Sequence, residues 1–101
     1  MQDIVQSKNG TSVRLTDERW THIVEEHSEM AGLRFDVLET VTNPSAIFEG
    51  HYAALMAIRE ISKDKYLIVV YREAGDDGFV ITAFMSRRQR FLTRRKKIWP
   101  V

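Results

Sequence analysis

Three histidines are the side chains of this sequence best suited to acid–base chemistry, because an imidazole gains or loses its proton near neutral pH. His22 and His27 belong to a run whose apolar residues recur at helical spacing. On that predicted helix His27 falls on the apolar face and His22 on the opposite face, whereas His51 follows Gly50 in a predicted turn. His27 is therefore either a core histidine with satisfied ring nitrogens or a general acid or base at the edge of the core.

The spacing of His22 and His27 argues against a metal site. Zinc motifs of the type H-E-x-x-H place two histidines on one helix face, whereas a spacing of five residues turns two imidazoles about 140° apart. The sequence has no cysteine and no cluster of carboxylates suited to magnesium. We therefore expect any catalysis to proceed without a metal or another cofactor.

Two arginines, Arg59 and Arg72, interrupt apolar runs that predict neighbouring strands of a hairpin. If the hairpin turn pairs Ile61 with Tyr66, Arg59 lies opposite Ile68 and on the same sheet face as Arg72, because side chains alternate along a strand. Two guanidiniums on one face suit a phosphate. The alternative is that both arginines lie at strand ends and pair with nearby carboxylates.

Thr82 lies in the next predicted strand, and two registers are open for it. Pairing Ala74 with Gly78 places Thr82 on the face of Arg72, whereas pairing Glu73 with Gly78 places it on the other face. In the first register a hydroxyl joins the guanidiniums, which is the composition of a phosphate-binding cleft.

The C-terminal run RRQRFLTRRKKIW, residues 87–99, is strongly basic. All 14 acidic residues of the chain precede it, so the charges form two blocks of opposite sign. Arg94 and Arg95 are candidates for binding a phosphate backbone, although the run suits an acidic protein partner or a solvated surface equally well. Trp99 argues against a floppy tail, because an exposed tryptophan is uncommon unless it packs or binds.

The composition is that of an ordinary globular protein: 101 residues, of which 44% are hydrophobic and 29% charged. This length suits one domain spanning residues 1–101. No apolar run approaches the roughly 20 residues needed to cross a bilayer, and the N-terminus lacks the pattern of a signal peptide. We therefore expect a cytoplasmic protein without a membrane partner.

The hydrophobic pattern predicts an α+β fold. A short strand leads to Thr16, a plausible N-cap of a helix that continues to about residue 31, and a second helix follows over residues 34–43. The remaining apolar runs are typical of strands, and the run at residues 65–73 suits a central strand buried on both faces. We predict two N-terminal helices packed on a four- to five-stranded antiparallel sheet, followed by a basic C-terminal segment.

Five runs of the sequence together resemble small phage- and toxin-associated proteins of the barnase–EndoU–colicin–RelE (BECR) nuclease-like group. In chain order they are VRLTDERWTHIVEEHSEM, VLETVTNPSAIFEG, KYLIVVYRE, GFVITAF and RRKKIW. The resemblance extends from about residue 13 to residue 99. It implies helices followed by a four-stranded antiparallel sheet, metal-independent RNA cleavage, and a toxin encoded beside a small antitoxin.

Carried over by position, the resemblance implies that His27 is a catalytic residue with His22 as its companion. Arg72 and Thr82 then contribute a cation and a hydroxyl to the same site. In metal-free RNA cleavage the ribose 2′-hydroxyl attacks the adjacent phosphate while a base accepts its proton, an acid protonates the leaving 5′-oxygen, and cations stabilise the extra charge. His27 would be that base or acid.

The predicted substrate contacts come from arginines. Arg59 would hold the phosphate together with Arg72, and Arg87 or Arg88 would bind the flanking RNA backbone. The predicted function is a small ribonuclease, the toxin of a toxin–antitoxin pair, whose partners are RNA and an antitoxin protein. The alternative is a non-catalytic module that uses the basic segment to bind nucleic acid or protein.

Overall fold

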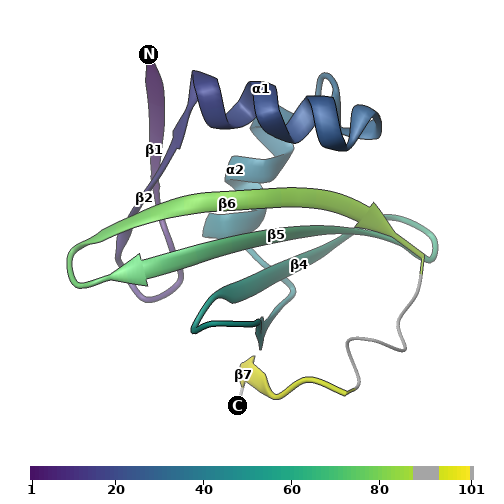
Figure 1. Cartoon of the computed structure of the whole chain (residues 1–101). Helices are drawn as coiled ribbons and strands as arrows, with labels where there is room; N and C mark the ends of the chain where they lie inside the picture. Colours follow the sequence, from purple (N-terminus) through teal and green to yellow (C-terminus); the bar gives the residue numbers. More distant parts are fainter. Residues whose placement is uncertain (88–93, 101) are drawn as a thin grey trace.

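A computed structural model describes residues 1–87 and 94–100 of the chain (Figure 1). The described residues form seven strands and two α-helices. In chain order the elements are β1 (Gln2–Gln6), β2 (Ser12–Thr16), α1 (Asp17–Glu26), a 3₁₀ helix η1 (Ser28–Met30), α2 (Arg34–Thr42), β3 (Ala46–Glu49), β4 (Leu55–Ser62), β5 (Lys65–Ala74), β6 (Asp77–Ser86) and β7 (Lys97–Trp99).

The strands form one mixed sheet in the order β1-β2-β6-β5-β4-β3-β7, in which β2 and β6 are parallel and the other neighbours antiparallel. The predicted fold class is therefore wrong in the number of strands, in their direction and in the placement of the helices after β1 and β2. β1 was missed because its short sequence, QDIVQ, has only two apolar residues. β7 is a three-residue strand inside the basic run, and its partner β3 is distant in sequence.

Both helices contact one face of the sheet, which we call the helix-covered face (Figure 1). The Thr16 side chain caps α1 as predicted, accepting a hydrogen bond from the Arg19 backbone N–H at 3.0 Å. The helix ends earlier than predicted, at Glu26, and His27 is its C-cap residue. The chain then turns through η1, which buries Met30 completely in the core. No helix within the described residues is long and apolar enough to cross a membrane.

The central strand β5 is buried on both faces, as its continuous apolar run predicted. Leu67, Val69 and Tyr71 are fully buried on the helix-covered face. Burial, reinforced by the nearby Glu73 carboxylate, raises the pKa of the Tyr71 hydroxyl. Ile68 points to the opposite face, which we call the helix-free face, and packs there in a second apolar cluster.

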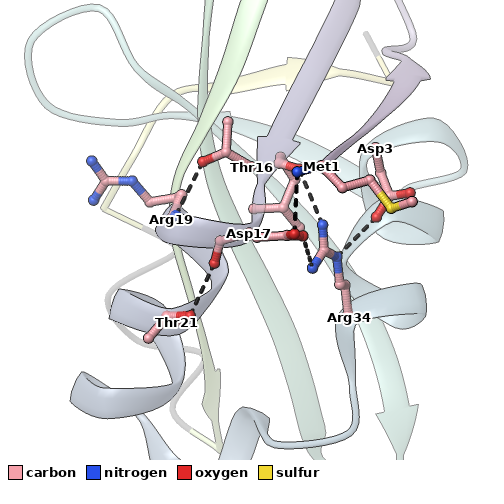
Figure 2. Close-up of polar contacts among 8 residues, drawn as sticks. Met1, Asp3, Thr16, Asp17, Arg19, Thr21 and Arg34 are labelled. Atoms are coloured by element: carbon pink, nitrogen blue, oxygen red, sulfur yellow. Dashed lines mark hydrogen bonds and ion pairs between the residues drawn. The ribbon is translucent and has the colours of Figure 1, made fainter.

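The Arg34 guanidinium connects the start of α2 to three other elements (Figure 2). Its Nε lies 2.8 Å from Oδ2 of Asp3 in β1, and its Nη1 lies 2.8 Å from Oδ1 of Asp17 in α1. Its Nη2 donates to the Leu15 carbonyl of β2 at 3.3 Å. These contacts hold the first hairpin and both helices together at one end of the molecule.

The Asp17 carboxylate gives this cluster a pH dependence. Hydrogen bonds from Arg34 and from the N-terminal amine lower the pKa of Asp17 below its ordinary value. A carboxylate with a lowered folded-state pKa stabilises the fold above its unfolded-state pKa, and this stabilisation disappears as the pH falls through the folded-state value.

We therefore predict that Asp17→Asn lowers the free energy of unfolding at pH 7, and that its difference from the wild type shrinks as the pH falls below about 4. Urea unfolding between pH 2.5 and 7 measures both quantities. Asp76→Asn, in the exposed turn between β5 and β6, is the matched control. An Asp17→Asn deficit that stays constant with pH would show that the carboxylate charge does not stabilise the cluster.

Candidate functional site

The β4–β5 hairpin places Arg59 on the helix-covered face. The prediction that Arg59 lies opposite Ile68 is wrong: Arg59 pairs with Leu67, because the register shifts by one residue between Glu60 and Ser62. Arg59 and Arg72 therefore lie on opposite faces. The Arg59 guanidinium instead contacts α2, where its Nη2 lies 3.2 Å from Oδ1 of an aspartate, residue 36. The predicted pairing of Arg59 with the Arg72 site is thereby excluded.

The β5–β6 hairpin places Thr82 on the helix-free face together with Arg72. Near the turn Glu73 pairs with Gly78, the register that by itself sends Thr82 to the helix-covered face. A one-residue bulge in β6 then shifts the register, so that Thr82 pairs with Val70. The Thr82 hydroxyl and the Arg72 guanidinium therefore share a face because of the bulge, and not because Ala74 pairs with Gly78.

A cavity of about 710 Å³ lies on the helix-free face. Its floor is made by apolar side chains of β4, β5 and β6, and its rim by the β3–β4 loop (residues 50–54), by Arg72 and by a residue that precedes β7. The lining residues are Gly50, His51, Tyr52, Ala54, Met56, Val70, Arg72, Ile81, Phe84 and Arg95. The cavity thus combines two guanidiniums, an imidazole and an apolar floor, and none of the described residues that line it is acidic.

Arg72, like Arg95, differs from the other half-buried arginines in forming no ion pair with a carboxylate among the described residues. Arg14, Arg34 and Arg59 each form an ion pair with an aspartate. Arg72 Nη2 donates to the Tyr52 carbonyl, and its buried Nε has no hydrogen-bond partner among the described residues. A buried guanidinium without an acidic partner is costly. An anion in the cavity would offset this cost.

The second guanidinium, Arg95, contacts the imidazole of His51. Arg95 Nη2 lies 2.9 Å from His51 Nε2. Since a guanidinium donates hydrogen bonds and accepts none, Nε2 must accept, which assigns the neutral form of His51 with its proton on Nδ1. His51 is exposed and therefore accessible to a ligand.

The loop that carries His51 is short and held in an uncommon conformation. The Gly50 backbone N–H donates to the Ala54 carbonyl at 2.8 Å, and the Ala54 N–H donates to the His51 carbonyl at 3.0 Å. Tyr52 and Ala53 have φ angles of 53° and 63°, in the left-handed region that side chains disfavour. Such strained residues occur preferentially at functional sites.

The two histidines singled out from the sequence, His22 and His27, do not line the cavity. His27 is partly exposed, with its Nδ1 3.9 Å from Oε2 of Glu29, so it is not sealed in the core. Its ring centroid lies 5.8 Å from that of Phe84, whose side chain lines the cavity, but His27 itself does not line it. His22 is exposed on α1, with its Nε2 3.9 Å from Oε1 of Glu18.

The basic candidates of the C-terminal run divide into two groups. Arg95 lines the cavity, whereas Arg87 and Arg94 are exposed and do not. Arg88 lies outside the described residues. Sequence reasoning gave His51 no role. The available signal was its position in the sequence Gly-His-Tyr, where two side chains able to bind RNA stand in a predicted turn.

No protein-family model matches the sequence, and no curated protein or solved structure does so either. Within residues 1–87 and 94–100, no group of three or more His, Asp or Glu side chains is arranged to hold a metal ion. The cavity is therefore interpreted from its own geometry and charge.

The strain at Ala53 predicts that Ala53→Gly raises the free energy of unfolding by about 0.5–1 kcal/mol, because glycine adopts a positive φ without a steric penalty. Ala31→Gly is the matched control: Ala31 is also exposed but has a φ of −55°. There glycine only increases the entropy of the unfolded chain, so the control should be destabilised. Urea unfolding at pH 7 compares the two, and changes of the same sign would contradict the strain.

Proposed function

We propose that this protein is a metal-independent ribonuclease that binds an RNA phosphodiester in the cavity on the helix-free face. One observation carries the proposal: Arg72 and Arg95 flank the cavity beside His51, and the part of the lining that the structure describes contains no acidic residue. Guanidiniums bind phosphate oxygens in a bidentate geometry. A neutral imidazole can accept a proton from a hydroxyl.

The chemistry starts with a neutral His51 whose Nε2 accepts a hydrogen bond from Arg95. A phosphate competes for the Arg95 guanidinium and leaves Nε2 free to accept the ribose 2′-proton. The 2′-oxygen then bonds to phosphorus, the bond from phosphorus to the 5′-oxygen breaks, and water protonates the leaving oxygen. The hydroxide that remains takes the proton from His51, which returns the imidazole to its neutral form. Arg72 and Arg95 stabilise the charge that develops on the phosphate oxygens. The products are a 2′,3′-cyclic phosphate and a 5′-hydroxyl.

The distribution of charge supports the approach of a polyanion from this side. Exposed acidic residues lie along α1 and η1, on the side of the sheet opposite to the cavity. They are Asp17, Glu18, Glu25, Glu26 and Glu29. Lys96 and Lys97 lie next to the cavity residue Arg95 and are exposed. RNA is therefore attracted to the helix-free face and repelled from α1.

Membership of the BECR nuclease-like group is part of the proposal and rests on the sequence resemblance. The strands β3, β4, β5 and β6 follow the two helices and are antiparallel to their neighbours among these four, but they belong to a seven-stranded mixed sheet that is larger than the resemblance implies. The candidate base changes from His27 to His51, because only His51 lines the cavity.

The proposal predicts that the purified protein cleaves single-stranded RNA in the presence of EDTA and leaves 2′,3′-cyclic phosphate ends. His51→Gln should lower kcat by roughly 100-fold or more, because it removes the proton acceptor. Arg72→Met should lower kcat/KM, whereas Arg19→Met, on exposed α1, should leave it unchanged. Cleavage assays on a labelled oligonucleotide, with mass analysis of the ends, measure these effects.

His27→Asn separates the two histidine assignments. Activity close to the wild type supports the cavity, whereas a loss comparable to that of His51→Gln would restore His27 as the catalytic histidine. A strict magnesium requirement would overturn the mechanism. Salt-dependent RNA binding without any turnover would favour a non-catalytic binding module.

The toxin assignment predicts that induced expression in a bacterial host arrests growth, because cellular RNA is cleaved. The variant His51→Gln, expressed to the same level, should permit growth. Co-expression of the product of a small acidic neighbouring reading frame should restore growth to cells that express the wild-type protein. Growth curves with matched protein levels measure this. Normal growth with an active enzyme would overturn the toxin assignment and leave the ribonuclease proposal standing.

A further inference from the structure

Tyr52 is an aromatic residue held almost entirely in solvent at the rim of the cavity. Tyr52 is 90% exposed, whereas Tyr66 is half-buried and Tyr71 is buried. Tyrosine ordinarily packs its ring against apolar neighbours. The exposure of Tyr52 therefore requires an explanation, because Tyr52 lines the same cavity as the apolar side chains of the floor.

The backbone of the loop holds this ring outward. Tyr52 itself has a φ of 53°, and the two hydrogen bonds between Gly50, His51 and Ala54 close the loop tightly. Arg72 donates to the Tyr52 carbonyl and so attaches the loop to β5. The backbone conformation of Tyr52 is consequently determined by several contacts, which preorganises the loop that carries the ring.

The surroundings of Tyr52 indicate what it contacts. The rings of His51 and Tyr52 have centroids 6.3 Å apart, and both residues line the cavity with Arg72 and Arg95. A phosphate held between the guanidiniums therefore lies beside an exposed aromatic ring. Aromatic rings next to basic residues are the standard surface for single-stranded nucleic acids, since every base has a π-face and every phosphate a charge.

We propose that Tyr52 is a stacking platform for an unpaired nucleobase adjacent to the phosphate in the cavity, and that the ligand of this site is single-stranded RNA. The inference rests on the proposed function for the phosphate site and adds the strandedness of the substrate. A duplex cannot use the platform, because its bases are already stacked and paired with their faces covered.

The test uses fluorescence anisotropy with a short, fully 2′-O-methylated RNA, both as a single strand and annealed to its complement, in EDTA. This probe has no 2′-hydroxyl, so its binding is measured whether or not the protein cleaves RNA. Tyr52→Ala should weaken single-strand binding on the order of 5- to 150-fold and leave duplex binding unchanged. Tyr52→Phe, which keeps the ring, should retain the affinity of the wild type.

Phe35→Ala is the matched control, because Phe35 is also an exposed aromatic residue, at 73%, but lies on α2 on the other face of the sheet. It should bind the single strand like the wild type. Equal losses for Tyr52→Ala and Phe35→Ala, equal losses for single strand and duplex, or no loss at all would each overturn the platform.

The outcome separates this inference from the ribonuclease proposal. Binding that depends on Tyr52, together with no cleavage of unmodified RNA, supports the platform and overturns the enzyme. Cleavage that depends on His51, together with single-strand binding that is insensitive to Tyr52→Ala, supports the enzyme and overturns the platform. Preferential binding of polyglutamate over RNA, with the same dependence on Tyr52, would identify an acidic protein segment as the ligand and overturn the proposal for RNA.

Discussion

The alternation of side chains along β5 is the constraint on which the arrangement of this protein depends. Because β5 is buried on both faces, each residue contributes to one of two apolar layers, and a shift of one residue in a neighbouring strand moves a side chain from one layer to the other. The chain contains such a shift on each side of β5, one in β4 and one in β6. The first sends Arg59 toward α2, and the second sends Thr82 to the face of Arg72.

The different surroundings of Arg59 and Arg72 follow from this alternation. Arg59 emerges under α2, where Asp36 neutralises its charge. Arg72 emerges on the helix-free face, where it forms no ion pair within residues 1–87 and 94–100 and its Nη2 donates to the Tyr52 carbonyl. The desolvation of two similar guanidiniums is therefore offset by an ion pair in one case and left partly uncompensated in the other. This difference is the basis for proposing that the helix-free face binds an anion.

Sequence reasoning predicted the local elements better than their assembly. The cap at Thr16, the helix α2 and the strands β5 and β6 follow from short-range patterns, and the structure contains each of them. Strand β7 is short and pairs with β3, which is distant in sequence and is identified by no local turn. Strand β1 has only two apolar residues, although a short turn that contains Asn9 and Gly10 connects it to its partner β2. The bulge between Glu60 and Ser62 also has no local signal, since nothing in the hairpin sequence requires an extra residue. The error for Arg59 follows from that bulge alone.

The candidate site was only partly predictable, for a related reason. Arg72, Thr82 and Arg95 were recognised because charged or polar residues stand out in apolar or basic runs. His51 and Tyr52 stand in a loop, where polar and aromatic residues are common, and their role depends on backbone angles that the sequence does not display.

The strain in the β3–β4 loop and the unpaired charge of Arg72 are linked by one hydrogen bond, from Arg72 to the Tyr52 carbonyl. The positive φ angles of Tyr52 and Ala53 disfavour the folded loop, and the hydrogen bond from Arg72 to the Tyr52 carbonyl opposes that cost. The same bond occupies one guanidinium nitrogen of Arg72, a residue that lines the cavity, and leaves its buried Nε without a partner among the described residues. A carboxylate in place of a lining residue would neutralise Arg72 more completely, but it would also repel a phosphate. Under the proposed function, the incomplete stabilisation of Arg72 is what leaves the cavity able to bind an anion.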